Sequence, residues 1–371
     1  MKFKRLMATL TCIISMPCYA LASGFMQQEL AASATGVANA FVATADDAAA
    51  ALINPAGQAW QDGLQLSAGY LVDYRDSSVK LPAGIAPNTG SEPNLFAFAL
   101  GWMPHDGRLG ATVAYAPAYH LQNDWGRFFG TKAGSTSLFI DRLSIDAVYR
   151  VSTTMSVAIG GDAYVTNMSL YEAGAVFHDR DYSTFGGHAS LLWKFAPQWS
   201  FGLMARSGAK VKLSSGTARM GLRLPEQVQF GLSYLLADAW RVEADALWSR
   251  WSAFRDMSVV SGGVVTMAHP LNLRDTLGGM LGLTWTLREN TQIRIGYAFD
   301  PGASRSIGFD PIVADQDGHR LAIGVGGNAF GMHLDLAYDY TFYADKKVVG
   351  VYAGTYRDRR QTIALTVSRL F

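Results

Sequence analysis

Apolar and polar residues alternate along much of the chain after residue 60. Between Trp240 and Trp248 one face is apolar, whereas the other carries Arg241, Glu243 and Asp245. Alternation alone also fits the sheet of a soluble protein in which one face is exposed to solvent. Several runs, however, extend for about 10 to 16 residues, longer than most globular strands, and end in Trp or Tyr as outer-membrane strands do. The pattern predicts strands that cross a membrane with their apolar face toward lipid.

Clusters of Gly, Pro, Asn and Asp divide these runs into about fourteen antiparallel strands, an even number as single-chain bacterial barrels have. The strands are expected to begin near Gly63, Asn94, Arg108, Ser137, Met155, Ser183, Trp199, Pro225, Trp240, Leu273, Thr291, His319, Gly331 and Arg357. Short links alternate with longer, irregular links, which include 170–182, 214–223 and 258–272. The fold class expected is therefore an all-β membrane barrel with both termini in the periplasm.

The alanine-rich stretch from Ser23 to Gly57 does not show strand alternation. Asp46 is expected to cap a short helix, which Pro55 then stops. Asn54 precedes this proline and must leave the α region, and Gly57 is expected to supply the following turn. We therefore expect an N-terminal, partly helical plug, or hatch, inside the lumen.

The N-terminus has the pattern of a secretory leader. Lys2, Lys4 and Arg5 precede an apolar run that is too short to span a membrane, and Ala20-Leu21-Ala22 fits a signal-peptidase site. The domains expected are a signal peptide at 1–22, a plug at 23–60 and a transmembrane barrel at 61–371.

Composition and charge narrow the possible functions. The 31 Lys and Arg residues nearly balance 30 Asp and Glu residues, so no basic excess favours nucleic acid. Both cysteines, Cys12 and Cys18, fall within the leader, which leaves the exported chain without a thiol metal ligand. None of the seven histidines lies in a recognisable catalytic motif. We expect no cofactor, no metal site and no enzymatic activity.

The third expected strand contains an irregularity at Tyr115-Ala116-Pro117. Because proline cannot donate to the ladder, pairing must break or bulge there. An opening in the wall and an ordinary bulge remain alternatives. At the other end of the chain, the final strand places apolar residues on one face and ends in Phe371, a tail of the kind that the barrel assembly machinery reads.

Several short blocks follow one another along the chain. Ser23-Gly24-Phe25 opens the expected mature chain, and Asp46-Asp47 is followed by Asn54-Pro55-Ala56. The later blocks are Arg206-Ser207, Lys210-Val211-Lys212, Leu224-Pro225-Glu226, Trp251-Ser252 with Phe254, and Asp315-Gln316-Asp317. In these blocks and their order the chain resembles the FadL/TodX family (OMPP1) of outer-membrane transporters of hydrophobic compounds, in which the first block is similar to the mature start and the second to the hatch motif.

The resemblance implies passive uptake of long-chain fatty acids or aromatic hydrocarbons across the bacterial outer membrane. In the family, a ligand is captured in a pocket, the hatch rearranges, and the ligand leaves sideways through an opening at the third strand. The implied ligand contacts are Phe25 and Asn54 in the plug, and the irregularity in the third strand adds Tyr115, Ala116 and Pro117 in the wall. The implied partners are a hydrophobic small molecule, outer-membrane lipid and lipopolysaccharide, and the assembly machinery.

Fatty-acid members use basic residues near the end of strand five and before strand ten to pair with the carboxylate. Here the stretch 164–170 has no Lys or Arg, and the second place offers His269, with Arg274 nearby. Because an unpaired carboxylate is costly to desolvate, a neutral or aromatic ligand is favoured. A general porin and a structural or receptor barrel are the alternative functions.

Overall fold

The computed structural model describes residues 25–28, 30–91, 94–126, 134–288, 291–306 and 309–371. The expected signal peptide and the first two residues of the expected mature chain lie outside these residues. Among the described residues, no helix is both long and apolar enough to cross a membrane.

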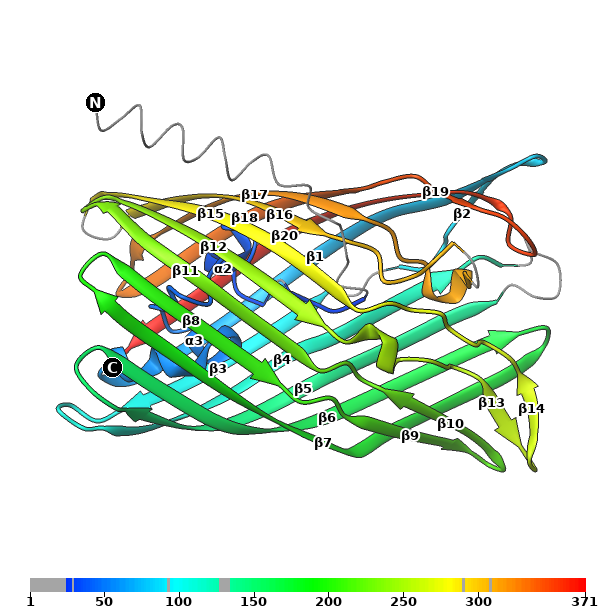
Figure 1. Cartoon of the computed structure of the whole chain (residues 1–371), viewed down its shortest axis with the longest axis horizontal. Coiled ribbons are helices and arrows are strands. Elements are labelled where there is room, and N and C mark those ends of the chain that lie inside the picture. Colours follow the sequence, from blue (N-terminus) through cyan, green and yellow to red (C-terminus); the bar gives the residue numbers. More distant parts are fainter. Residues whose placement is uncertain (1–24, 29, 92–93, 127–133, 289–290, 307–308) are drawn as a thin grey trace.

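Fourteen antiparallel strands form a closed barrel, as the sequence predicts, because the last strand pairs with the first along residues 65–80 (Figure 1). The wall strands, in chain order, are β1 (Gly63–Leu81), β3 (Leu95–Met103), β4 (Leu109–Asp124), β5 (Ser135–Arg150), β6 (Met155–Glu172), β7 (Ala175–Ala196), β8 (Trp199–Arg206), β11 (Gln227–Ala237), β12 (Trp240–Ser249), β15 (Thr276–Arg288), β16 (Thr291–Asp300), β17 (Gly318–Ala329), β18 (Met332–Tyr343) and β20 (Gly354–Leu370).

The expected alternation is present in the wall. In β12, Glu243 and Asp245 are buried on the lumen side, whereas Ala244 between them is exposed outward. Trp240 stacks on Trp285 of β15 near the ends of these strands, with ring centroids 4.9 Å apart. Aromatic pairs of this kind are typical of the girdle at a membrane interface. The register therefore separates a lipid-facing surface from a polar lumen.

Several links that were expected to be irregular are ordered hairpins. Residues 170–182 belong mostly to β6 and β7, which are joined by a turn at Ala173 and Gly174, so the expectation of a loop there is wrong. The other hairpin strands are β2 (Gly84–Pro87), β9 (Lys210–Ser215), β10 (Ala218–Arg223), β13 (Val259–Ser261), β14 (Val264–Met267) and β19 (Lys346–Val348), and the short helices are η2 (Trp251–Ala253) and η3 (Pro311–Val313). Strands β9, β10, β13 and β14 form a separate sheet at the end of the barrel remote from the C-terminus (Figure 1).

Residues 30–60, which we call the plug segment, lie inside the barrel. They form α2 (Ala32–Thr35), α3 (Ala50–Ile53) and η1 (Pro55–Trp60). Figure 1 shows α2 and α3 within the ring of strands, toward the end that carries the C-terminus. The plug segment is almost wholly buried, and its alanines contact wall residues such as Ala97 and Ala337.

The local structure of the plug differs from the expectation at Asp46. Asp46 is not an N-cap, because α3 begins after Ala49 and Asp46 instead pairs with Arg241 of the wall. Asp47 accepts a hydrogen bond from the Ala49 N–H at 2.9 Å. Helix α3 does end before Pro55, and Asn54 is extended with φ −140°. Pro55 then starts η1, where proline suits the first turn because its missing N–H would have no helical partner.

Glycines in the wall let the plug backbone approach closely. A Cβ atom added to Gly202 would lie 2.1 Å from the Val42 carbonyl oxygen, and one added to Gly296 would lie 2.2 Å from the Val37 carbonyl carbon. Gly57 within η1 has the same role rather than that of a turn, since its Cβ would lie 2.1 Å from the Ala45 oxygen. Glycine inside a strand often marks such a close approach.

Candidate functional site

The expected irregularity in β4 is present. Pairing of β4 with β5 shifts between Pro117 and Tyr119, which is a β-bulge. Four consecutive residues, 116–119, are buried where a regular strand would alternate. Pro117 lacks an N–H, so it removes one donor from the ladder at this point. The bulge turns the side chain of Tyr119 toward the interior, where it is only 3% exposed.

The ladder between β3 and β4 also stops at the bulge. These strands pair from Trp102 with Ala111 as far as Phe98 with Tyr115. The first residues of β3, from Leu95 to Ala97, pair only with β1, where Leu71 is opposite Leu95. Beyond Tyr115, β4 therefore has no backbone bond to β3 among the described residues. We call this interruption the wall gap.

The N-terminal residues 25–27 occupy the position of a pairing strand beside the wall gap. The Gln27 N–H donates to the Ala118 carbonyl at 3.0 Å, and the His120 N–H donates to the Phe25 carbonyl at 2.9 Å. Met26 and Tyr119 are thus opposed as an antiparallel bridge. These bonds satisfy β4 groups that β3 leaves without a partner. Within the part of the chain that the structure describes, two backbone bonds hold residues 25–27 to β4, so these residues are held less firmly than a strand of the wall.

Phe25 packs into a group of aromatic rings that we call the aromatic compartment. Its ring centroid lies 6.1 Å from that of Tyr119, 4.8 Å from Trp251 and 5.3 Å from Phe254. Trp251 and Phe254 are fully buried and belong to the largest apolar cluster of the interior. Aromatic and aliphatic walls of this kind favour an apolar ligand.

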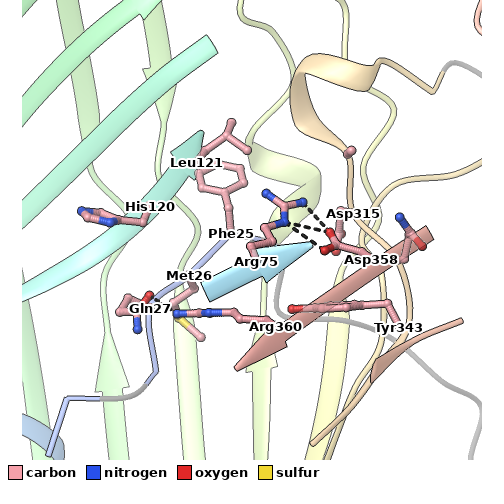
Figure 2. Close-up of a pocket in the computed structure, with 12 residues that line it drawn as sticks. Phe25, Met26, Gln27, Arg75, His120, Leu121, Asp315, Tyr343, Asp358 and Arg360 are labelled. Atoms are coloured by element: carbon pink, nitrogen blue, oxygen red, sulfur yellow. Dashed lines mark hydrogen bonds and ion pairs between the residues drawn. The ribbon is translucent and has the colours of Figure 1, made fainter. Parts of the chain in front are cut away.

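A cavity of about 60 Å³ adjoins the N-terminal residues. Figure 2 shows the Arg360 side chain reaching toward Met26 and Gln27, and the paired Arg75 and Asp358 beside Phe25. Arg75 Nε donates to the Asp358 carboxylate at 2.9 Å, while Arg360 donates to Gln27 Oε1 at 2.9 Å and also pairs with Asp73. The cationic groups of this cavity therefore already have acidic partners.

Arginines near the aromatic compartment are paired in the same way. Arg206 and Arg142 both face Asp162, and Asp162 also lies 3.1 Å from His188 Nδ1. Elsewhere in the lumen Arg320 pairs with Asp300 at 3.0 Å. A buried arginine that already has a carboxylate partner offers little further stabilisation to a fatty acid headgroup, since the existing pair would have to be broken first.

His269 lies in the link after β14, outside the wall, and is 1% exposed. Its Nδ1 is 2.8 Å from Asp310, and its Nε2 is 3.3 Å from Glu172 at the end of β6. Burial alone would lower the pKa of His269, but the hydrogen bond to Asp310 and the negative charges of both carboxylates raise it overall. The side chain joins three outer links and does not line the cavity beside Phe25.

The other residues implied as ligand contacts are dispersed. Arg274 donates to the Gly302 carbonyl at 3.2 and 3.1 Å and lies 3.8 Å from Asp317. Tyr115 is 37% exposed on the outer surface, whereas Ala116 is buried against the plug segment. The structure therefore brings Phe25 to the bulge at Pro117 and leaves Arg274 among the outer links.

Asn54 and the rest of the hatch motif are engaged in structural contacts. The Asn54 amide donates to the Val42 carbonyl at 2.7 Å and to the Leu191 carbonyl at 3.1 Å, and its side-chain oxygen accepts from the Ala56 N–H. The Ala56 N–H also donates to Ser190 at 3.1 Å. Asn54 is fully buried and joins the plug to β7.

Four residues around Phe25 were not predicted from the sequence as candidate ligand contacts: Trp251, Phe254, Tyr119 and Met26. An available signal was the occurrence of Trp251 and Phe254 three residues apart in a segment without strand alternation. Their meeting with Phe25 depends on contacts between residues more than two hundred positions apart. Spacing along the chain does not reveal such contacts.

Comparison with known proteins gives one family match and many structural matches. The model of the family described as "Outer membrane protein transport protein (OMPP1/FadL/TodX)" matches residues 171–368. A comparison with curated proteins finds no match.

Solved structures share the fold at low sequence identity. A FadL homologue from Pseudomonas aeruginosa is 16% identical with a TM-score of 0.80, covering 94% of this chain and 100% of that one. The toluene transporter TbuX of Ralstonia pickettii is 17% identical with a TM-score of 0.68, covering 93% and 99%. The toluene transporter TodX of P. putida is 17% identical with a TM-score of 0.66, covering 91% and 98%.

Proposed function

The chain belongs to the OMPP1/FadL/TodX family of outer-membrane transport proteins, and from this premise we propose that it takes up neutral hydrophobic molecules by passive lateral diffusion. The ligand enters the aromatic compartment, displaces residues 25–27 and leaves through the wall gap into the bilayer. The observation that carries the proposal is the interrupted β3–β4 ladder, which is covered by residues 25–27 and not by a strand.

Burial of apolar surface drives the first step. An apolar molecule gains about 25 cal/mol per Å² of surface removed from water. In the proposed path it takes the place of the Phe25 ring against Trp251 and Phe254, which are already desolvated. Moving from this compartment to lipid costs little because both surroundings are apolar. The path needs no energy source.

We further propose a neutral ligand, aromatic or aliphatic, over a fatty acid. A carboxylate entering the compartment would need a cation, and Arg206, Arg142, Arg75 and Arg360 each face Asp groups. The titles of TbuX and TodX name them as toluene transporters, which supports an aromatic hydrocarbon here. Retention of radiolabelled toluene against oleate by the purified protein tests this choice. Stronger retention of oleate would overturn it.

The proposed role of the hatch is to couple the pocket to the wall gap. Asn54 holds the plug to β7, and Asp46 holds it to Arg241. In this proposal ligand binding at Phe25 loosens the N-terminal part of the plug, while Pro55 and Ala56 remain bound to the wall.

Replacement of Pro117 by valine, together with Ala118 by threonine, tests the lateral exit. The variant supplies an N–H and strand-forming side chains, so that the β3–β4 ladder can extend across the gap. We expect a folded barrel that has lost uptake. Pro87→Val in the exposed hairpin strand β2 is the matched control and should retain it. Normal uptake in the double variant, with normal heat-modifiable mobility, would contradict the proposal.

A general porin remains the second candidate. A steady open-pore current of the wild-type protein in planar bilayers would favour it. The plug segment opposes this candidate, since its buried alanines occupy the lumen.

A further inference from the structure

The hairpin of β9 and β10 carries basic side chains on its outer face. In β9, Val211 and Leu213 are buried in the interior cluster. Lys210 and Lys212 alternate with them and are exposed on the opposite face. Lys210 stands directly across from Arg223 of β10. Like charges placed opposite each other destabilise a hairpin unless another group compensates them.

The described acidic groups compensate this cluster only in part. Glu226 lies 3.9 Å from Arg223 but is shared with Arg250, 3.5 Å away. Among the described residues neither Lys210 nor Lys212 forms an ion pair. The three basic residues line a cavity of about 500 Å³ together with Thr184 and Phe185 of β7, and we call this cavity the basic pocket.

An apolar groove of about 460 Å³ lies beside the basic pocket on the outer face of β6, β7 and β8. Its floor includes Gly187, which pairs with the exposed Gly161 across the β6–β7 ladder. Ile159 and Ala189 flank it, and Ile159 is 69% exposed. A Cβ on Gly161 would meet no atom within 4 Å, and one on Gly187 would meet only the Gly160 oxygen at 3.5 Å. Packing within the protein therefore does not require either glycine.

The two depressions adjoin each other along the membrane normal. Ser207, which lines the groove, is followed directly by Gly208 of the basic pocket. In Figure 1, β9 and β10 lie beside β7 toward the end of the barrel with the long hairpins, which is remote from the C-terminus. That end faces outward in a barrel whose termini are periplasmic. The apolar groove thus lies at bilayer depth and the basic pocket above it.

We propose that the groove and the basic pocket together bind a phosphorylated, acylated lipid of the outer leaflet, with its phosphate on Lys210, Lys212 and Arg223 and an acyl chain over Gly187. The negative charge of the phosphate offsets the repulsion between Lys210 and Arg223, which face each other across the hairpin. The site is separate from the exit path, because β5 and β6 stand between β7 and the wall gap in β4. Lipid bound here anchors the β9–β10 hairpin against the membrane.

Binding of a diphosphorylated hexa-acyl lipid A to the purified full-length protein tests the proposal. Lys210→Gln/Lys212→Gln should bind it about thirtyfold more weakly, since each basic residue near a charged lipid surface contributes roughly a factor of five. Gly187→Leu should fill the groove and weaken binding about tenfold. The control Lys80→Gln/Lys347→Gln removes two exposed lysines elsewhere and should bind as wild type does.

Two further probes separate the lipid from a free anion. The same lipid without its phosphates should bind at least tenfold more weakly, and millimolar inorganic phosphate should not displace the intact lipid. Wild-type affinity in either test variant, equal binding of the dephosphorylated lipid, or full displacement by inorganic phosphate would each overturn the proposal. In Lys210→Gln/Lys212→Gln, unchanged heat-modifiable mobility would show that the barrel is folded. Unchanged uptake would show that the weaker lipid binding is independent of the transport proposal.

Discussion

The plug segment and the aromatic compartment lie inside the same barrel, but the wall holds them with different contacts. The plug backbone donates to Asp245 at 3.0 and 3.1 Å and to Glu243 at 2.7 Å, and it meets wall glycines at close range. The compartment is held by ring contacts around Phe25. Directional bonds and tight backbone contacts fix one arrangement, whereas apolar contacts can exchange partners at small cost. From this difference we expect the plug to stay fixed while a ligand enters the aromatic compartment.

The largest effect is expected from adding a side chain where the plug meets the wall. Gly202→Val should destabilise the protein by about 3 kcal/mol, because the Val42 carbonyl must move from a Cβ 2.1 Å away. The displaced plug should also permit a steady ion current. Denaturant unfolding in detergent and planar-bilayer recording measure the two results.

Gly279→Val is the matched control for this change. Gly279 lies in β15 on the exposed face, and a Cβ there would meet no atom within 4 Å. It should unfold as wild type does and carry no current. Equal stability of the two valine variants would contradict the idea that the plug is fixed by close contact.

Removal of one carboxylate should have the next largest effect. Asp245→Ala leaves the Phe41 and Val42 N–H groups without their acceptor, at a cost of about 2 kcal/mol. Asp245→Asn keeps one side-chain oxygen acceptor and should recover part of the loss. Unfolding of the two variants side by side provides the measurement. An alanine variant as stable as wild type would show that these bonds do not hold the plug.

The aromatic compartment should respond in the opposite way, with little change in stability and a clear change in transport. Phe25→Ala should cost about 1 kcal/mol, because the ring is only partly buried. Toluene uptake should become faster, since the ligand no longer competes with the ring for Trp251. Phe25→Leu retains an apolar side chain and should behave more nearly as wild type. Loss of uptake in Phe25→Ala would contradict displacement of the ring.

The smallest effect is expected at the outer links that His269 joins. The pKa of His269 is raised by Asp310 and Glu172 against the opposing effect of burial. The charged form of His269 therefore stabilises these outer links fully below about pH 6.5, and the stabilisation is lost as the pH rises through the raised pKa. Hydrogen exchange of residues 257–271, corrected for intrinsic rates, should show more frequent opening at pH 8.5 than at pH 5.5.

His269→Asn should remove most of this pH dependence. His178→Asn, at an exposed position of β7, is the control and should leave it unchanged. If these outer links opened more readily at acidic pH in the wild type, the upward shift of the His269 pKa would be contradicted.

The barrel could be predicted from the sequence more completely than the site. Strand alternation and turn residues predicted fourteen strands, five of which begin at the expected residue: β1, β6, β8, β12 and β16. Pro117 predicted the bulge because the missing N–H is a local property. The hairpins after residue 170 were missed, although Lys210-Val211-Lys212-Leu213 of β9 does alternate polar and apolar residues.

The site depends on contacts that local patterns do not contain. In the sequence Asp245 and Glu243 are marked only as polar residues on one face of a strand, but in the structure they accept hydrogen bonds from the plug backbone. Asp46 was expected as a helix cap because Asp is a common cap residue, and a wall arginine provides its partner. Glycines within the wall strands were a usable signal for a close approach of another backbone, because glycine otherwise weakens a strand.

A reversible disulfide across the wall gap tests the central claim most directly. Met26 and Tyr119 form a non-hydrogen-bonded antiparallel pair. The Cα atoms of such a pair are about 4.5 Å apart, which suits a disulfide. Met26→Cys/Tyr119→Cys should lose toluene uptake when oxidised and regain it on reduction, whereas the wall pair Ser67→Cys/Ala99→Cys should transport in both states. Undiminished uptake by the oxidised Met26–Tyr119 pair would contradict exit through the wall gap.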